Sequence, residues 1–167
     1  DLCQWAAGYD NIQPVEYEPV GTNVGPYKVL CKYANGVKLV MRDDGWDGAL
    51  KTGSCSFRIE GDKGWVETGD QTRIECSDNI RPLLRPTESA SLALVNHVAD
   101  LLRAIKSRQT PKASAAAAAN SHVTCHAAFI AYQRGKTLSW DVAKREFTND
   151  DIANRMRSRA LREPWRI

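Results

Sequence analysis

Apolar and polar residues alternate along six short segments in the first half of the chain. The alternation has a period of two residues, which is typical of β-strands with one buried face and one polar face. The predicted strands span residues 15–18, 27–33, 37–42, 56–60, 65–67 and 73–76. Such strands, joined by short turns, are expected to form an open, mainly antiparallel sheet.

Turn residues separate these strands at two places. Asn35-Gly36 predicts a tight hairpin because both residues tolerate a positive φ angle, and residues 61–64 (GDKG) predict a second turn. The polar face of the sheet would carry Lys28, Lys32, Lys38, Arg42, Arg58, Glu60 and Glu75. We expect a face with so many charges to be solvated or paired with a second subunit in a homo-oligomer.

The second half of the chain has helical periodicity. Residues 1–7 read as the end of a helix that Gly8 stops, and longer helices are predicted over residues 89–106 and 113–133. Residues 138–140 predict a short strand. A final helix is expected to begin near Asn149 and to carry Arg155, Arg157 and Arg159 towards its end. Strands followed by helices predict an α+β fold, with helices packed on one face of the sheet, in a single domain over residues 1–167.

Composition and charge narrow the function classes. The 167 residues are 43% hydrophobic and 26% charged, as in soluble globular proteins, and no apolar run reaches the roughly 20 residues of a membrane span. The net charge of +3 comes from residues 134–167, where acidic residues interrupt the basic ones. This pattern favours a solvated or inter-subunit face over a nucleic-acid-binding site. A nucleic-acid-binding protein would be retained on DNA in a strongly salt-dependent way.

Five widely spaced cysteines form no C-x-x-C pair, so we expect no structural zinc site. Several fall at inward strand positions, where a free cysteine acts as a small hydrophobe, and this favours a reducing compartment such as the cytoplasm.

Two groups of residues could contact a substrate. His122 and His126 are four residues apart and share a helix face. The segment between them lacks the glutamate of the zinc-protease motif, which argues against a zinc-protease site. The two histidines are therefore expected either to be packed or hydrogen-bonded or to contact a substrate. Between two strands, Trp46 could stack on a sugar ring and Asp47 could accept its hydroxyls, unless this segment is only a connecting loop. No glycine-rich nucleotide loop and no complete catalytic set occur, so no catalytic, cofactor-binding or metal-binding residue is assigned.

The C-terminal stretch carries a distinctive combination: Leu138-Ser139-Trp140-Asp141, then the segment FTNDDIANR over residues 147–155, then Arg162-Glu163-Pro164-Trp165. It resembles the ending of many bacterial members of the glucose–fructose oxidoreductase/inositol dehydrogenase (Gfo/Idh/MocA) family. The hairpins at residues 33–37 and 59–65 and the helix before Gly8 also resemble that family.

The resemblance implies half of an enzyme. In the family, an N-terminal Rossmann domain binds NAD or NADP, the C-terminal domain is an open antiparallel sheet backed by helices, and a sugar or polyol lies between the two domains. Asp1 matches the last residue of the family's H-x-x-D helix and would orient that helix, whereas the catalytic residues belong to the part that precedes Asp1. The substrate-side candidates are therefore Asp1, Trp5, Trp46, Asp47, His122 and His126.

Two positions depart from the pattern of these members. Residues 119–121 read Ala-Asn-Ser where members often have H-R-S, which implies a different specificity if that histidine touches substrate. Val142 replaces a proline after Trp140-Asp141, which should alter only the turn.

Two function classes follow. The half-enzyme reading expects a glycine-rich strand–turn–helix upstream, a histidine three residues before Asp1, and no activity from this chain alone. The alternative is a stand-alone carbohydrate-binding or scaffold module, which would bind a sugar by itself and quench the fluorescence of Trp46. A periplasmic location also stays open, because some members of the family are exported.

Overall fold

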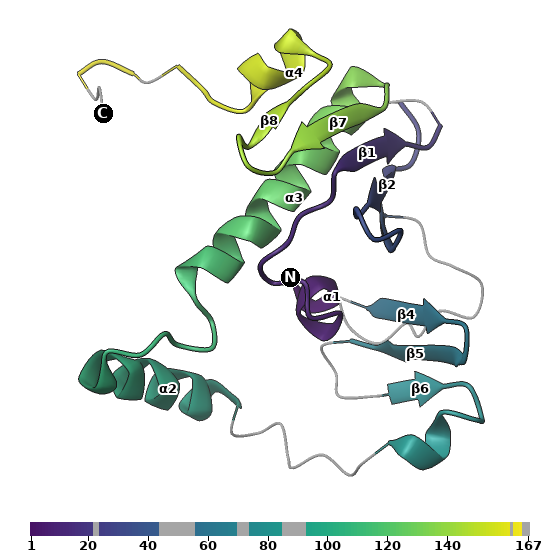
Figure 1. Cartoon of the computed structure of the whole chain (residues 1–167), viewed down its shortest axis with the longest axis vertical. Coiled ribbons are helices and arrows are strands. Elements are labelled where there is room, and N and C mark those ends of the chain that lie inside the picture. Colours follow the sequence, from purple (N-terminus) through teal and green to yellow (C-terminus); the bar gives the residue numbers. More distant parts are fainter. Residues whose placement is uncertain (22–23, 44–55, 70–73, 85–92, 161, 165–167) are drawn as a thin grey trace. The chain divides into compact units, whose positions relative to one another are not determined.

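A computed structural model describes residues 1–21, 24–43, 56–69, 74–84, 93–160 and 162–164 (Figure 1). They form two compact units. The first unit comprises Asp1–Gly8 and Trp46–Ala118, and the second comprises Tyr9–Gly45 and Ala119–Ile167. Among the helices of the described part, none has the length and apolar character needed to cross a bilayer.

The second unit is built on a five-stranded antiparallel sheet with the order β3-β2-β1-β7-β8. Its strands are β1 (Glu16–Pro19), β2 (Lys28–Lys32), β3 (Lys38–Arg42), β7 (Leu138–Asp141) and β8 (Glu146–Phe147). The predicted hairpin joins β2 to β3, where Gly36 has a φ of +87° and the amide of Val37 donates to Asn35 Oδ1 over 3.2 Å. An L-residue with a side chain rarely adopts this φ, so glycine is the residue that the turn requires.

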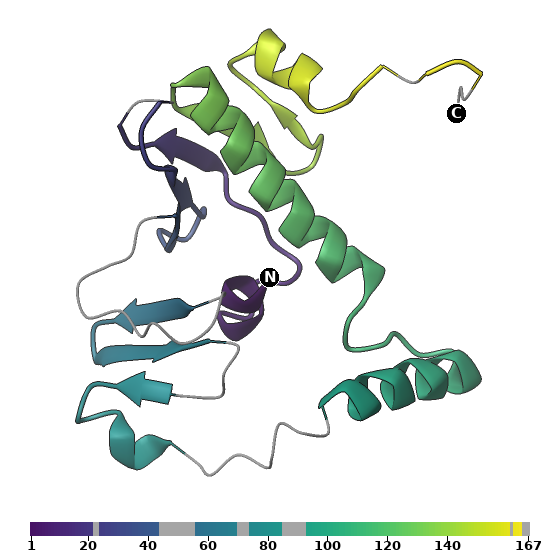
Figure 2. The ribbon, with the colours of Figure 1, turned by 180° about the vertical axis from the view of Figure 1, so that it is seen from behind.

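Helix α3 (Ala115–Arg134) covers one face of this sheet, as the two opposite views in Figures 1 and 2 agree. The core lies between them. Fully buried Tyr17, Cys31 and Leu138 from the sheet belong to the same buried cluster as Ala128 and Ala131 from the helix. The small alanine side chains let the helix backbone approach the larger side chains of the sheet, so the alanine-rich sequence serves close packing as well as helix propensity.

Burial changes the acidity of two groups in this core. It raises the pKa of the Cys31 thiol to about 12, and it raises the pKa of the Tyr17 hydroxyl well above its usual range. Both groups therefore stay protonated and act as part of the packed interior.

Helix α4 (Asp151–Met156) closes the second unit beside β8. Its N-cap is Asp150, whose Oδ1 accepts from the amide of Ala153 over 2.9 Å. The side chain of Asn154 pairs with the backbone of Phe147 in both directions, at 2.8 Å and 2.7 Å, and so ties α4 to the neighbouring strand.

The first unit contains a separate antiparallel sheet with the order β4-β5-β6. Its elements are α1 (Leu2–Ala6), β4 (Phe57–Gly61), β5 (Gly64–Thr68), β6 (Ile74–Cys76), the 3-10 turn η1 (Arg81–Leu83) and α2 (Ala93–Ser107). Buried Glu67 faces Arg58 at 3.8 Å, and the Arg58 guanidinium lies 4.1 Å from the centre of the Trp65 ring. These paired charges explain how a carboxylate is tolerated at 1% exposure.

The predicted α+β class with antiparallel strands is confirmed, and several details differ. The strands divide between two sheets instead of forming one. Neither η1 nor the two-residue strand β8 was predicted, because such short elements show no periodicity. Helix α4 ends at Met156, so Arg157 and Arg159 follow the helix instead of completing it.

Candidate functional site

Two of the predicted substrate-side residues lie on α1 in the first unit. Asp1 is the exposed N-cap of this helix, and Trp5 is 66% exposed, whereas Gln4 faces the interior. An indole ring held by a helix and open to solvent can stack on a sugar ring. Trp46 and Asp47, the predicted sugar-contacting pair, lie outside the described residues.

The two predicted histidines lie together on α3 in the second unit. The rings of His122 and His126 are stacked, with centroids 6.2 Å apart and planes inclined at 30°. Both side chains are exposed, so neither histidine is part of the buried core. Among the described residues, no third histidine, cysteine or carboxylate completes a set that could hold a metal ion.

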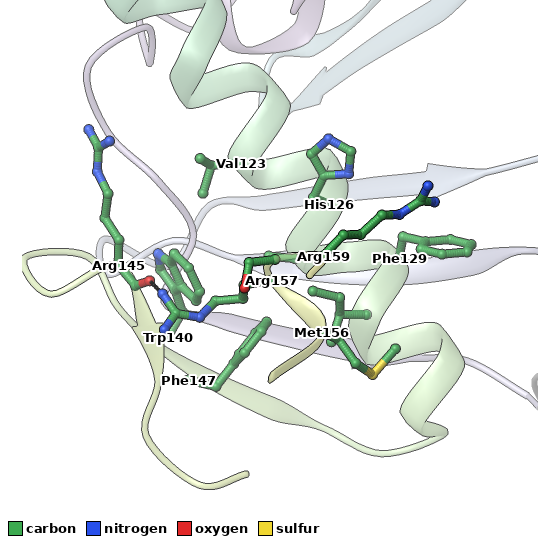
Figure 3. A pocket seen from close by; sticks show the side chains of 12 residues that line it. Val123, His126, Phe129, Trp140, Arg145, Phe147, Met156, Arg157 and Arg159 are labelled. Carbon is green, nitrogen blue, oxygen red and sulfur yellow. Dashed lines mark hydrogen bonds between the residues drawn. The ribbon is translucent and has the colours of Figure 1, made fainter. Parts of the chain in front are cut away.

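One of these histidines, His126, lines a pocket of about 460 Å³ (Figure 3). The pocket lies among α3, the hairpin of β7 and β8, and the residues at and after the end of α4. Its apolar lining includes Phe129, Trp140, Phe147 and Met156. A volume in this range is typical of small-molecule sites, which usually span about 300–1,000 Å³.

Three arginines complete the lining of the pocket: Arg145, Arg157 and Arg159. Arg157 is held in place because its guanidinium donates to the carbonyl of Arg145 and to that of Asn154. Figure 3 shows the guanidinium groups of Arg145 and Arg159 on opposite sides of Arg157. The pocket thus combines an apolar interior with one guanidinium that is held in place, that of Arg157, and two exposed arginines.

A buried hydrogen-bond chain fixes Trp140 in the wall of the pocket. Its indole N–H donates to Gln13 Oε1 over 2.9 Å, and Gln13 Nε2 donates to Asn120 Oδ1 over 3.1 Å. Asn120 Nδ2 then donates to the carbonyl of Asp10 over 2.9 Å. Asn120, one of the residues that depart from the H-R-S pattern, therefore anchors the segment before β1 to α3.

An ion cluster fixes the start of α4 on the other side of the hairpin. Asp150 is nearly buried, and its Oδ2 lies 3.0 Å from Arg134 Nε and 2.9 Å from Lys136 Nζ. The capping amide of Ala153, followed by these two cations, holds the pKa of the Asp150 carboxyl well below its usual range. The carboxylate consequently stays charged and keeps the end of the hairpin in register with α4.

Sequence reasoning found His126 but missed the three arginines of the pocket. Arg157 and Arg159 were interpreted as a solvated or inter-subunit face, and Arg145 belongs to a turn with no motif. Positive φ at Arg145, +56°, is a backbone feature that the residue type did not indicate. The turn between β7 and β8 brings Arg145 to the pocket, and the chain after α4 brings Arg157 and Arg159.

The family resemblance implies NAD or NADP in an N-terminal Rossmann domain, and the described strands of this chain lack the arrangement that binds a dinucleotide. Dinucleotides bind where parallel strands end at the first turns of following helices, whereas every strand pairing among the described residues is antiparallel. We therefore assign no residue here to the cofactor.

Comparison with protein families gives a match along the whole chain. The family described as "Oxidoreductase family, C-terminal alpha/beta domain" matches residues 1–167. Searches of curated proteins and of solved structures returned no match. The antiparallel sheets, the helices and the family match agree with the resemblance seen in the terminal motifs: this chain belongs to the Gfo/Idh/MocA oxidoreductase family, as its C-terminal α/β domain.

Proposed function

We propose that this chain is the substrate-side and oligomerisation domain of an NAD(P)-dependent oxidoreductase that acts on a sugar or polyol. The observation that carries the proposal is the family match over residues 1–167. The family is generally NAD(P)-dependent through its N-terminal domain. The chemistry then belongs to the two domains together, and this chain supplies contacts to the substrate.

Helix α1 supports the substrate-side role. Trp5 offers a largely exposed aromatic face, and Asp1 lies one helical turn away on the same short helix. An aromatic ring beside a carboxylate suits a sugar, because the ring can cover the C–H face while the carboxylate accepts hydroxyl protons. The wall formed by α1 would complete the substrate site when the nucleotide-binding domain is present.

The test uses the full open reading frame that contains this chain. We expect NADH or NADPH formation at 340 nm with at least one member of a panel of sugars and polyols, and Trp5→Ala should raise KM more than it lowers kcat. Trp5→Phe is the matched control, since it keeps an aromatic face. Absence of cofactor reduction with every member of the panel would refute the proposed redox function.

The outward face of the five-stranded sheet supports the oligomerisation role. Leu30 and Val40 are cross-strand partners on this face, and Val40 is 43% exposed. Lys28, Lys38 and neighbouring cations lie on β2 and β3, at one side of the face. Apolar residues flanked by charge at an open face are typical of a subunit interface.

Acidic residues lie on the other strands of the same face. On β1, Glu16 Oε1 and Glu18 Oε2 lie 2.6 Å and 2.8 Å from Lys32 Nζ. On β7 and β8, at the opposite edge of the sheet from β3, Asp141 and Glu146 are cross-strand neighbours. A second copy related by a two-fold axis would bring the cationic strands of one face against the acidic strands of the other. This self-complementarity favours a symmetric dimer.

Sedimentation velocity of the chain tests the dimer. We expect Val40→Glu to raise the dimer Kd at least about a hundredfold, because it would bury an unpaired charge in the interface. Val142→Glu is the matched control, since Val142 is 38% exposed in the turn between β7 and β8. A monomeric parent chain, or equal effects of the two variants, would refute this interface.

A further inference from the structure

We propose that the pocket around His126 binds a small organic anion, made of an apolar body about the size of one aromatic ring and a carboxylate or phosphate group. The inference goes beyond the function proposed above, because it rests on the lining of this pocket and not on the family or on α1. Three observations carry it: a rigid apolar interior, an excess of cationic side chains, and a volume that suits one small molecule.

The apolar interior is formed before any ligand arrives. Trp140 and Phe147 are 6% and 2% exposed, and their rings meet edge to face with centroids 4.9 Å apart. Gln13 fixes the indole of Trp140 through the hydrogen bond described above. A ligand ring would therefore meet a preorganised surface and would not have to order these side chains on binding.

Two further apolar side chains are only partly covered. Phe129 is 51% exposed and Met156 is 42% exposed, and both line the pocket. Water against these side chains would be released when an apolar group enters. The methionine can adjust its shape to the incoming group, because its side chain is unbranched and flexible.

The charge of the lining selects an anion. Arg145 and Arg159 form no ion pair within the part of the chain that the structure describes, and Arg157 is held by two backbone carbonyls. No acidic residue is among the described residues that line the pocket. A carboxylate or phosphate would meet guanidinium groups, which are well suited to both.

The combination excludes simpler ligands. A neutral sugar could lay its C–H face on Phe129, but it would leave the guanidinium groups of the lining without an anionic partner. A bare inorganic anion would leave the apolar surface hydrated. The volume of about 460 Å³ holds a single ring with a short acidic side chain.

Nuclear magnetic resonance of the full chain tests the proposal with four defined probes. Phenylacetate and phenyl phosphate carry both features, 2-phenylethanol carries the ring alone, and inorganic phosphate carries the charge alone. The chain has only two methionines, so the Met156 methyl reports on the pocket and the Met41 methyl on β3 serves as an internal reference. We expect a saturable shift of the Met156 signal with one or both of the ring-bearing anions and an unchanged Met41 signal.

Matched variants assign the effect to the lining. Arg145→Gln and Arg159→Gln should each weaken binding about threefold, and together about tenfold, as expected for exposed charge pairs. Arg155→Gln is the control, because Arg155 is exposed on α4 and does not line the pocket. Phe129→Ser should weaken binding about fivefold through the lost apolar contact. An unchanged Met41 signal shows that each variant is folded.

Several outcomes would overturn the proposal. Equal binding of 2-phenylethanol would remove the selection for charge, and equal binding of inorganic phosphate would remove the role of the apolar interior. A larger response to a fifth probe, a short acidic peptide with one phenylalanine, would overturn the proposal in favour of a protein partner. Equal weakening by Arg155→Gln, or no saturable Met156 shift, would also refute it. Failure here leaves the cofactor-reduction assay and the sedimentation result unaffected, so the two proposals fail separately.

Discussion

The hydrogen-bond chain through Gln13 should be the largest polar contribution to the stability of the second unit. Gln13 accepts from the Trp140 indole and donates to Asn120, which in turn holds the carbonyl of Asp10. Gln13→Leu removes both bonds of this side chain while keeping its approximate volume. It leaves the buried indole N–H of Trp140 without its acceptor and the Asn120 carbonyl without its donor.

The magnitude follows from the burial of these groups. Gln13 and Trp140 are 5% and 6% exposed, so water cannot replace the lost partner without a rearrangement. An unpaired buried donor costs about 1–3 kcal/mol and the partly buried amide of Asn120 about 1 kcal/mol more, so we expect Gln13→Leu to destabilise the unit by about 2–4 kcal/mol. A double-mutant cycle with Trp140→Phe should give a coupling energy of about 1 kcal/mol for the indole bond alone.

Native-state hydrogen exchange measures this on the second unit by itself. The amide of Val15 donates to Lys32 and that of Trp140 donates to Val15, each over 2.8 Å, so both report the opening of this sheet. Gln133→Leu is the matched control, because Gln133 is exposed on α3, and it should change the opening free energy by less than about 0.5 kcal/mol. The reasoning is wrong if Gln13→Leu costs no more than this control or if the cycle shows no coupling.

Further predictions concern one ion cluster, two thiols and one turn. Because the pKa of the Asp150 carboxyl is depressed in the folded state, its carboxylate stabilises the fold above the unfolded pKa near 4, and this stabilisation is lost as the pH falls. At pH 7 the urea midpoint of Asp150→Asn should therefore lie below that of the parent. A difference between the two midpoints that does not narrow towards pH 3 would contradict the prediction. Cys31 should react with a disulfide reagent at pH 8 at least about a hundredfold more slowly than exposed Cys125, because burial raises the pKa of the Cys31 thiol. For the same reason, the contribution of Cys31 to the free energy of unfolding should fall as the pH rises above about 8.5. Equal labelling of the two cysteines, measured by mass spectrometry, would exclude a buried Cys31 thiol. Gly64→Ala should destabilise the β4–β5 hairpin by more than about 2 kcal/mol, because φ at Gly64 is +140° and an added Cβ atom would clash with the Ser77 hydroxyl. Gly61→Ala on the same hairpin is the control and should be tolerated. Equal urea midpoints of the two variants would contradict the prediction.

Local features of the fold could be predicted from sequence because they depend on near neighbours. The period-two segments became strands, Asn35-Gly36 became the hairpin turn, and Gly8 follows a helix end with a φ of +71°. Terminal motifs identified the family, which the match over residues 1–167 confirmed. Each of these inferences rests on residue spacing and backbone preference, and none of them requires knowledge of which distant segments meet.

The pairing of strands that are distant in the sequence could not be predicted from residue spacing. Alternation fixes which face of β1 is buried, yet it does not say that β7, more than a hundred residues later, pairs with the same strand. The separation of β4–β6 into their own sheet has the same cause, since hairpins form locally and sheet edges are matched only by tertiary contacts.

The candidate site follows the same division. The sequence by itself determined that His122 and His126 share a helix face and that the family is an oxidoreductase family. Only the tertiary structure decided that His126 lines a pocket with Arg145, Arg157 and Arg159, because these cations come from a turn and from the chain after α4. The physical reason is that helix and strand periods constrain residues a few positions apart, whereas a pocket is set by where separate elements return to one another.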